Sequence, residues 1–282
     1  MFLEKDPTAF EIVTVQAGVR SLRSRGCGET FHPVVGPMTE AVGLHVRQQR
    51  LVERAVATAG RFVIWDVGLG AAANAIAAIE AFSGREESEN PVELHSFDVT
   101  DAALRFALSH AEDLVYPVPH VGAGESLLEK GEAQIGNVHW KFHPGDFHAT
   151  MALAPAPHAI LYDPYSPQTN PGMWTLEHFT KLRAQLAADA PCFLTNYTRS
   201  TAVRVTLLLA GFFVGSGHAT GEKDQTTIAS NDLSLLEEPL DAAWLKRVQR
   251  STNGAPLHTG IARPCPITPE DWQKLLSHPQ FA

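Results

Sequence analysis

Cysteine, long apolar runs and an excess of positive charge are all scarce in this chain. Three cysteines occur among 282 residues, and their odd number and scattered positions argue against a disulfide framework and a cysteine-rich metal site, so no metal is expected. The longest apolar stretches, at 62–67 and 203–214, are too short or too polar to cross a bilayer, and no signal-peptide core is seen near the start. We therefore expect a cytoplasmic protein with no membrane partner.

Positive charge is too sparse to attract nucleic acid over the whole surface. The 22 lysines and arginines are outnumbered by 31 acids, which leaves a formal net charge of -9. Any nucleic-acid partner would need a local basic patch, because affinity for phosphate depends on lysine and arginine contacts.

Short β-rich runs alternate with helical patterns from residue 61 onward, which is typical of an α/β fold. The predicted strands are 62–67, 92–98, 138–142, 159–163, 192–197, 212–216 and 226–230. The predicted helices, which carry apolar residues at three- and four-residue spacing, are 71–81, 101–114, 173–188 and 199–209. We expect a seven-stranded, mostly parallel sheet with helices on both faces.

The flanking segments predict further elements. Before the core, the pattern indicates a hairpin at 10–22 and an amphipathic helix at 39–59 with Thr39 as its N-cap. After the core, short helices are expected at 241–249 and 269–276. The expected parts are an N-terminal lid or edge at 1–60, a core at 61–232 and a C-terminal extension at 233–282.

A glycine-rich loop follows the first core strand and precedes a helix, where a helix N-terminus can meet a nucleotide-bearing ligand. It reads Asp66-Val67-Gly68-Leu69-Gly70-Ala71-Ala72-Ala73-Asn74. Gly68-x-Gly70-x-x-Ala73 matches the dinucleotide fingerprint in its alanine form, whereas Asp66-x-Gly68-x-Gly70 is the pattern of S-adenosylmethionine-dependent methyltransferases. The loop alone leaves both ligands open.

Carboxylates at the ends of the next strands favour the methyltransferase. Asp98, Asp146 and Asp163 each follow a predicted strand, at the edge where open sheets bind ligands. Asp98 would accept hydrogen bonds from ribose hydroxyls, and Asp146 from the exocyclic amine of adenine. Carboxylates tolerate a positive sulfonium but repel a diphosphate, so an NAD-dependent oxidoreductase is the weaker alternative.

The strand at 159–163 runs into a loop that is stiffened by prolines, Asp163-Pro164-Tyr165-Ser166-Pro167. Proline fixes φ and keeps the preceding residue extended, so Asp163 and Tyr165 would be held in place as site residues. Further along, Trp174 would either stack on a substrate base or pack in the core.

These blocks together resemble the MnmC-like methyltransferase family, which comprises the methyltransferase part of bifunctional tRNA wobble-uridine enzymes and its stand-alone relatives. The resemblance spans about residues 29–230. Its motifs are Glu29-Thr30-Phe31-His32 with Gly36 and Glu40, the Asp66-Val67-Gly68-Leu69-Gly70 loop with Asn74, Ser96-Phe97-Asp98, Gly145-Asp146, Asp163-Pro164-Tyr165-Ser166-Pro167 with Asn170-Pro171-Gly172-Met173-Trp174-Thr175, and Gly211-Phe212-Phe213-Val214-Gly215-Ser216.

The resemblance implies a Rossmann-like class I S-adenosylmethionine-dependent methyltransferase that methylates the 5-aminomethyl nitrogen of wobble uridine 34 in tRNA. Asp163 and Tyr165 would be catalytic and would face the amine. Tyr165, Trp174 and Arg199 would contact the substrate. The cofactor-binding residues that it implies are Glu40, Asp66, Gly68, Gly70, Asn74, Asp98, Asp146 and Asp163.

The chain also departs from this family. Alanine stands at position 72 where members carry glycine, and residues 221–225 replace a basic cluster, which weakens the expected docking of tRNA. The flavin half of the bifunctional enzymes has no counterpart in these 282 residues, so a separate FAD-dependent partner enzyme or another precursor pathway is expected. Two alternatives remain: a methyltransferase for a small-molecule or protein amine, and a non-catalytic partner protein with the same fold.

Overall fold

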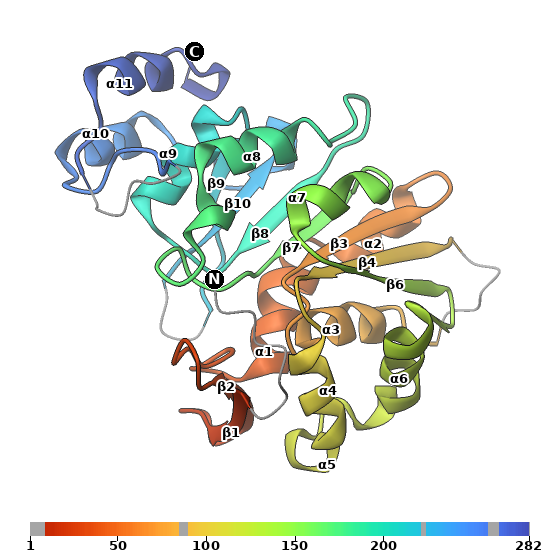
Figure 1. The fold of residues 1–282 in the computed structure, drawn as a ribbon. Coiled ribbons are helices and arrows are strands. Elements are labelled where there is room, and N and C mark those ends of the chain that lie inside the picture. Colours follow the sequence, from red (N-terminus) through yellow and green to blue (C-terminus); the bar gives the residue numbers. More distant parts are fainter. Residues whose placement is uncertain (1–8, 85–89, 221–223, 259–264, 282) are drawn as a thin grey trace.

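An eight-stranded sheet forms the centre of the molecule, with strand order β5-β6-β4-β3-β7-β8-β10-β9 (Figure 1). The computed structural model describes residues 9–84, 90–220, 224–258 and 265–281. The strands are β3 (Phe62–Val67), β4 (Val92–Asp98), β5 (Glu132–Ile135), β6 (Val138–Pro144), β7 (Ala159–Tyr162), β8 (Phe193–Asn196), β9 (Phe213–Gly217) and β10 (Thr226–Ser230). The seven strands predicted from the sequence are all present, and β5 is the additional one.

Strand direction creates a crevice at the middle of this sheet. The strands β6, β4, β3, β7 and β8 are parallel, whereas β5 and β10 run antiparallel to their neighbours. The chain passes from β3 to β4 on one side and later returns to β7 on the other. Open α/β sheets bind ligands at such a switch point, beyond the carboxyl ends of the strands. The predicted fold class is confirmed.

Alternating side chains of β3 pack into two apolar layers, one on each face of the sheet. Val63, Trp65 and Val67 join the layer that contains α7, α8 and α9. Phe62 and Ile64 join the layer that contains α2, α3, α4 and α6. These helices are α7 (Phe147–Thr150), α8 (Leu176–Arg183) and α9 (Thr201–Leu209) on one face, and α2 (Leu51–Ala57), α3 (Ala73–Ala81), α4 (Ala102–Ser109) and α6 (Val121–Lys130) on the other (Figure 1).

The N-terminal segment contains the predicted hairpin but not the predicted single helix. The strands β1 (Phe10–Thr14) and β2 (Arg20–Ser24) pair antiparallel as a separate sheet. The helix predicted at 39–59 is divided into α1 (Pro37–Ala41), the π-helix η2 (Val42–Arg47) and α2. Thr39 is not its N-cap: Gly36 holds that position, and Pro37 begins the helix because proline needs no N–H donor there. Arg50 adopts the left-handed conformation, with φ 49°, and so interrupts the helical backbone before α2.

The C-terminal segment packs on the face that holds α8 and α9. Its helices α10 (Ala242–Arg250) and α11 (Pro269–Leu276) lie near the predicted positions and contribute Trp244 and Leu275 to that apolar layer. The division of the chain into three parts stays a prediction. The remaining short elements are α5 (Ala111–Leu114), η3 (Val118–His120), η4 (Met151–Leu153), η5 (Pro171–Trp174), η6 (Leu233–Leu235) and η7 (Pro279–Phe281). None of the helices described has the length and apolar character that a membrane span requires.

Candidate active site

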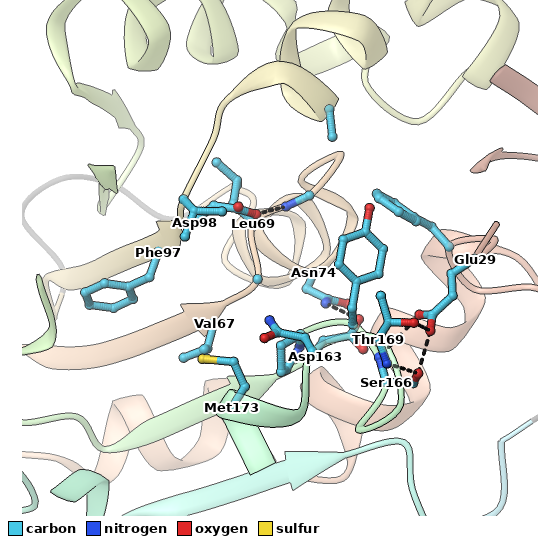
Figure 2. A pocket seen from close by; sticks show the side chains of 18 of the residues that line it. Glu29, Val67, Leu69, Asn74, Phe97, Asp98, Asp163, Ser166, Thr169 and Met173 are labelled. Atoms are coloured by element: carbon cyan, nitrogen blue, oxygen red, sulfur yellow. Dashed lines mark hydrogen bonds between the residues drawn. The ribbon is translucent and has the colours of Figure 1, made fainter. Parts of the chain in front are cut away.

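A cavity of about 930 Å³ opens beyond the carboxyl ends of the parallel strands. Three of its walls are the loops that follow β3, β4 and β7, and a fourth is the N-terminal segment from 29 to 40. Figure 2 shows Leu69, Asp98 and Asp163 from these loops around one hollow, with Glu29 approaching from the N-terminal segment. This volume suits a nucleoside-sized ligand together with part of a substrate.

The glycine loop after β3 is shaped by close contact with the loop after β7. Gly68 has φ 95°, and a Cβ atom there would lie 2.7 Å from the Asp163 carbonyl oxygen, so only glycine fits without displacing that loop. The Gly70 N–H donates to Asp98 Oδ2 at 3.0 Å. The two predicted cofactor glycines and Asp98 therefore meet at the cavity.

The helix that follows begins in an unusual conformation. Ala72 precedes α3 with φ 63° and ψ 18°, the left-handed region that favours glycine. In the first turn of α3, the 4% exposed Asn74 donates from Nδ2 to Asp163 Oδ2 at 2.8 Å (Figure 2). Asn74 thus connects the glycine loop to the predicted catalytic carboxylate.

Asp66 lies below the cavity instead of lining it. Its side chain is fully buried in β3 and accepts a hydrogen bond from Ser96 Oγ at 2.7 Å. Burial, with smaller contributions from the nearby Asp163 and Asp98 carboxylates, raises the pKa of Asp66 to about 8. Asp66, which was predicted to bind the cofactor, is therefore buried beneath the cavity and does not line it.

Glu29 holds the proline-stiffened loop from the opposite wall. Ser166 Oγ and Thr169 Oγ1 both donate to Glu29 Oε1, and the Ser166 N–H donates to Oε2 at 3.3 Å (Figure 2). The Tyr165 ring meets the Phe31 ring edge to face at a centroid distance of 5.7 Å. These contacts keep Tyr165 on the cavity wall beside Asp163. Glu29 belongs to the first sequence motif but was not predicted as a site residue.

Trp174 and Arg199 do not line the cavity, and the expected contact of Arg199 with the substrate stays a prediction. Trp174 is 0% exposed and donates its indole N–H to the Tyr165 carbonyl at 2.9 Å. Of the two sequence interpretations, the structure places it in the core, because the preceding Met173 is the residue that faces the cavity. Arg199 lies on the surface with a guanidinium nitrogen 3.6 Å from Asp224 Oδ2.

His32 lies between two predicted site carboxylates. Its Nε2 atom is 3.8 Å from Asp163 Oδ2, and its Nδ1 atom is 3.9 Å from Glu40 Oε2. The His32 backbone has φ 47°, which is uncommon outside glycine. No role was predicted for His32 from the sequence, although its place between Glu29 and Glu40 in the first motif was the available signal.

A histidine pair forms another wall, beside Asp146. The Asp146 carboxylate accepts from the His148 N–H at 3.0 Å and caps α7. The His148 Nε2 atom is 3.0 Å from His178 Nδ1, and His178 Nε2 is 2.8 Å from the Tyr162 hydroxyl. Burial lowers the pKa of His178 to about 3, so this ring is neutral at pH 7. The described residues contain no group of three or more side chains placed to hold a metal ion.

Negative charge dominates the cavity. Lys181 is the only lysine or arginine among the described residues that line it. The carboxylates that line it are Glu29, Glu40, Asp98, Asp146, Asp163 and Glu177. Such a lining stabilises a sulfonium or an ammonium and disfavours a diphosphate, so the described site fits S-adenosylmethionine better than NAD.

Comparison with known proteins agrees with this chemistry. Residues 118–232 match the sequence model of a family described as S-adenosyl-L-methionine-dependent methyltransferase. The "tRNA 5-methylaminomethyl-2-thiouridine biosynthesis bifunctional protein MnmC" of Ectopseudomonas mendocina is 27% identical over 242 residues, covering 79% of this chain and 35% of the relative. The protein of the same name from Azoarcus sp. is 30% identical over 213 residues, covering 72% and 33%. The chain thus spans about a third of the length of these relatives.

A solved structure shows the same fold. The crystal structure of MNMC2 from Aquifex aeolicus superposes with a TM-score of 0.70 at 24% identity and covers 98% of this chain and 87% of that one. The fold inferred from the sequence motifs is therefore confirmed, and the sequence matches above bear out the resemblance itself.

Proposed function

We propose that this chain, an S-adenosylmethionine-dependent methyltransferase of the MnmC type, methylates the 5-aminomethyl nitrogen of wobble uridine 34 in tRNA. The observation that carries the proposal is the position of Asp163. Its carboxylate lies on the cavity wall, bonded to Asn74 at the glycine loop and followed by Tyr165. The names of the relatives, which refer to tRNA 5-methylaminomethyl-2-thiouridine, support the choice of acceptor.

The cofactor would occupy the part of the cavity next to the glycine loop. Gly68 and Gly70 line the cavity there, and their backbone packs closely against the Asp163 carbonyl and the Phe31 ring. Asp98 would accept from the ribose hydroxyls and Asp146 from the adenine amine. The sulfonium of S-adenosylmethionine supplies an electrophilic methyl group, and the surrounding carboxylates, Glu40 among them, stabilise its charge.

The acceptor amine would lie against Asp163 and Tyr165. Methyl transfer is an in-line displacement, so holding the amine about 3 Å from the methyl carbon supplies much of the rate enhancement. The Asp163 carboxylate would orient the amine through a hydrogen bond and stabilise the positive nitrogen that forms. Tyr165 would pack its ring against the uracil or the sulfonium.

A tRNA substrate requires basic side chains that contact its phosphates. Burial excludes some of the lysines and arginines of this chain from that role. Arg204 is 2% exposed and donates to Thr227 Oγ1 and the Thr226 carbonyl, so it serves the core instead of a phosphate. The exposed basic residues of α10 are Lys246, Arg247 and Arg250. We propose them as phosphate contacts, which predicts that tRNA affinity falls steeply with salt. Of the segment expected to carry the basic cluster, residues 221–223 lie outside the described residues.

A small-molecule or protein amine is the second candidate acceptor. The excess of carboxylates in the cavity and the net charge of -9 suit a cationic amine that carries no phosphates. If the acceptor is tRNA, the aminomethyl group would come from a separate FAD-dependent enzyme or another pathway, in the cytoplasm.

Methyl transfer onto undermodified tRNA tests the proposal. The tRNA would be prepared from a strain that lacks this methylation, incubated with the protein and labelled S-adenosylmethionine, and analysed by mass spectrometry of nucleosides. We expect label in the wobble uridine, and none with tRNA that lacks the aminomethyl group. At saturating cofactor, Asp163→Asn should lower kcat by roughly 100-fold. Transfer to a small amine but to no tRNA would instead establish the second candidate.

A further inference from the structure

His32 faces both the reacting end of the cavity and a second carboxylate. Its side chain is 10% exposed, while those of Glu40 and Asp163 are 12% and 16% exposed. Its Nε2 atom is 3.8 Å from the Asp163 carboxylate and its Nδ1 atom is 3.9 Å from the Glu40 carboxylate. The ring is therefore placed to receive and hold a proton beside Asp163.

The backbone keeps this ring in place against its conformational preference. His32 has φ 47°, and a residue with a side chain in this region costs on the order of 1 kcal/mol. The preceding residue is fixed on both backbone groups, because the Phe31 N–H donates to the Leu22 carbonyl at 2.8 Å and Ser21 Oγ donates to the Phe31 carbonyl. The fold thus tolerates local strain to point the imidazole at the cavity.

The proposed acceptor needs a base before it can react. An alkylamine such as lysine has a pKa of about 10.4, so only about one molecule in a few thousand is neutral at pH 7. Only the neutral amine has the electron pair that attacks a methyl carbon. An aspartate carboxylate is a weak base at this pH, with an ordinary pKa of about 3.9, whereas histidine exchanges protons near neutrality.

We propose that His32 is the proton acceptor of the transfer, a role that rests on the proposed function. The ammonium N–H bond breaks, and its proton passes by way of Asp163 Oδ2 to His32 Nε2. The freed nitrogen electron pair forms the bond to the methyl carbon, while the C–S bond breaks and its electrons stay on sulfur. The product is a secondary ammonium, and the proton on His32 leaves to solvent. Glu40 positions the ring from the Nδ1 side.

The charged groups around His32 are compatible with this role. Besides Glu40 and Asp163, the buried His45 lies close enough for the two rings to repel each other. Burial, with this repulsion as the smaller cause, lowers the pKa of His45 to about 3, so His45 stays neutral and does not compete for the proton. Tyr197 also lies near, within the field of Asp163, Glu29 and Glu40, and burial raises its pKa, so it stays protonated at neutral pH.

His32→Asn tests the proposal, because asparagine accepts a left-handed backbone yet does not titrate in this range. At pH 7, with undermodified tRNA as the probe, we expect kcat/KM to fall by roughly 100-fold. Between pH 7 and 9.5 the rate of the variant should rise about tenfold per pH unit, as free amine accumulates, until it is within about fivefold of wild type. Affinity for S-adenosylhomocysteine, measured by calorimetry, should change by less than about threefold.

Two further variants sharpen the test. His139→Asn, on β6 beside Glu132 and away from the cavity, is the matched control and should behave as wild type. Glu40→Gln removes the carboxylate that faces Nδ1 while keeping its size, so kcat/KM at pH 7 should fall by roughly tenfold and recover toward pH 9.5, as in His32→Asn.

The outcomes separate the two proposals. A deficit in His32→Asn that stays constant with pH would show a structural role only, and an unchanged rate would overturn the inference outright. If His32→Asn does not fold, a Glu40→Gln variant with the kcat/KM of wild type at pH 7 decides against the inference. Absence of transfer by the wild-type protein would count against the tRNA assignment itself.

Discussion

Gly68→Ala should push the loop that carries Asp163 away from the glycine loop that follows β3. Two effects combine at this position: φ is 95°, and the added Cβ would lie 2.7 Å from the Asp163 carbonyl oxygen and 3.1 Å from Pro164 Cα. The first effect costs about 1–2 kcal/mol, and forcing an atom into a packed site costs about 1–3 kcal/mol more. Relief of the contact needs a shift of about half an ångström in the backbone that carries Asp163. Such a displacement should lower kcat at least tenfold, since about 1 Å of misplacement can reduce a rate 100-fold.

Gly60→Ala is the matched control for this substitution. Gly60 has φ 81°, but a Cβ atom there would meet nothing within 4 Å, so it reports backbone strain alone. At about 2 °C per kcal/mol for a chain of this size, Gly60→Ala should lower Tm by about 2–4 °C and leave kcat unchanged. Gly68→Ala should lower Tm by about 4–10 °C. Equal melting temperatures and equal kcat values in the two variants would refute the argument that the two loops are in contact.

Two other substitutions examine the supports of the site. Glu29→Gln removes the negative charge that accepts three hydrogen bonds from Ser166 and Thr169. We expect kcat to fall roughly tenfold with little change in cofactor affinity. A wild-type kcat in steady-state assays would show that these hydrogen bonds do not hold the loop in its catalytic position. In the folded protein Asp66 keeps its proton up to about pH 8, whereas in the unfolded chain it loses the proton near its ordinary pKa of 3.8. Between these two pH values the unfolded state is favoured increasingly as pH rises, and the free energy of unfolding falls. Asp66→Asn should therefore gain about 1–2 kcal/mol relative to wild type between about pH 5.5 and 7.5 in urea melts, and parallel curves would show that the carboxyl is already ionised.

The strands of the core were predictable because burial leaves a direct trace in the sequence. The bounds predicted for β3, β4 and β10 coincide with the observed ones, and β3, which is covered on both faces, reads as a short apolar run, Phe-Val-Ile-Trp-Asp-Val. The strand β5 was missed because it has only four residues, Glu-Ala-Gln-Ile, of which two are polar and exposed at the sheet edge. The single helix predicted at 39–59 was wrong because amphipathic spacing continues across the left-handed turn at Arg50.

The site residues that could be predicted from the sequence are those whose position follows from the topology of the parallel sheet. Parallel strands bring their carboxyl ends to one edge, so the amino-acid sequence was enough to group the residues that directly follow β3, β4, β6 and β7. Glu29, His32 and His178 could not be grouped in this way, because they come from the N-terminal segment and α8, whose approach to the cavity depends on tertiary packing. Trp174 was ambiguous because the sequence does not show whether a residue at this position faces the cavity or the apolar core.

The N-terminal segment makes two neighbouring contacts with the loop that carries Asp163, and we expect the two contacts to form and break together. Glu29 and His32 are three residues apart, and one holds the loop of Ser166 while the other faces Asp163 at the start of that loop. We therefore expect a displacement of this segment that breaks the Glu29 contacts to move the imidazole away from the carboxylate as well. The glycines, Asp98 and Asp146 of the proposed cofactor part come from the loops after β3, β4 and β6, and Glu40 is the site residue that the N-terminal segment adds to it. Loosening the N-terminal segment should accordingly impair methyl transfer well before it impairs cofactor binding.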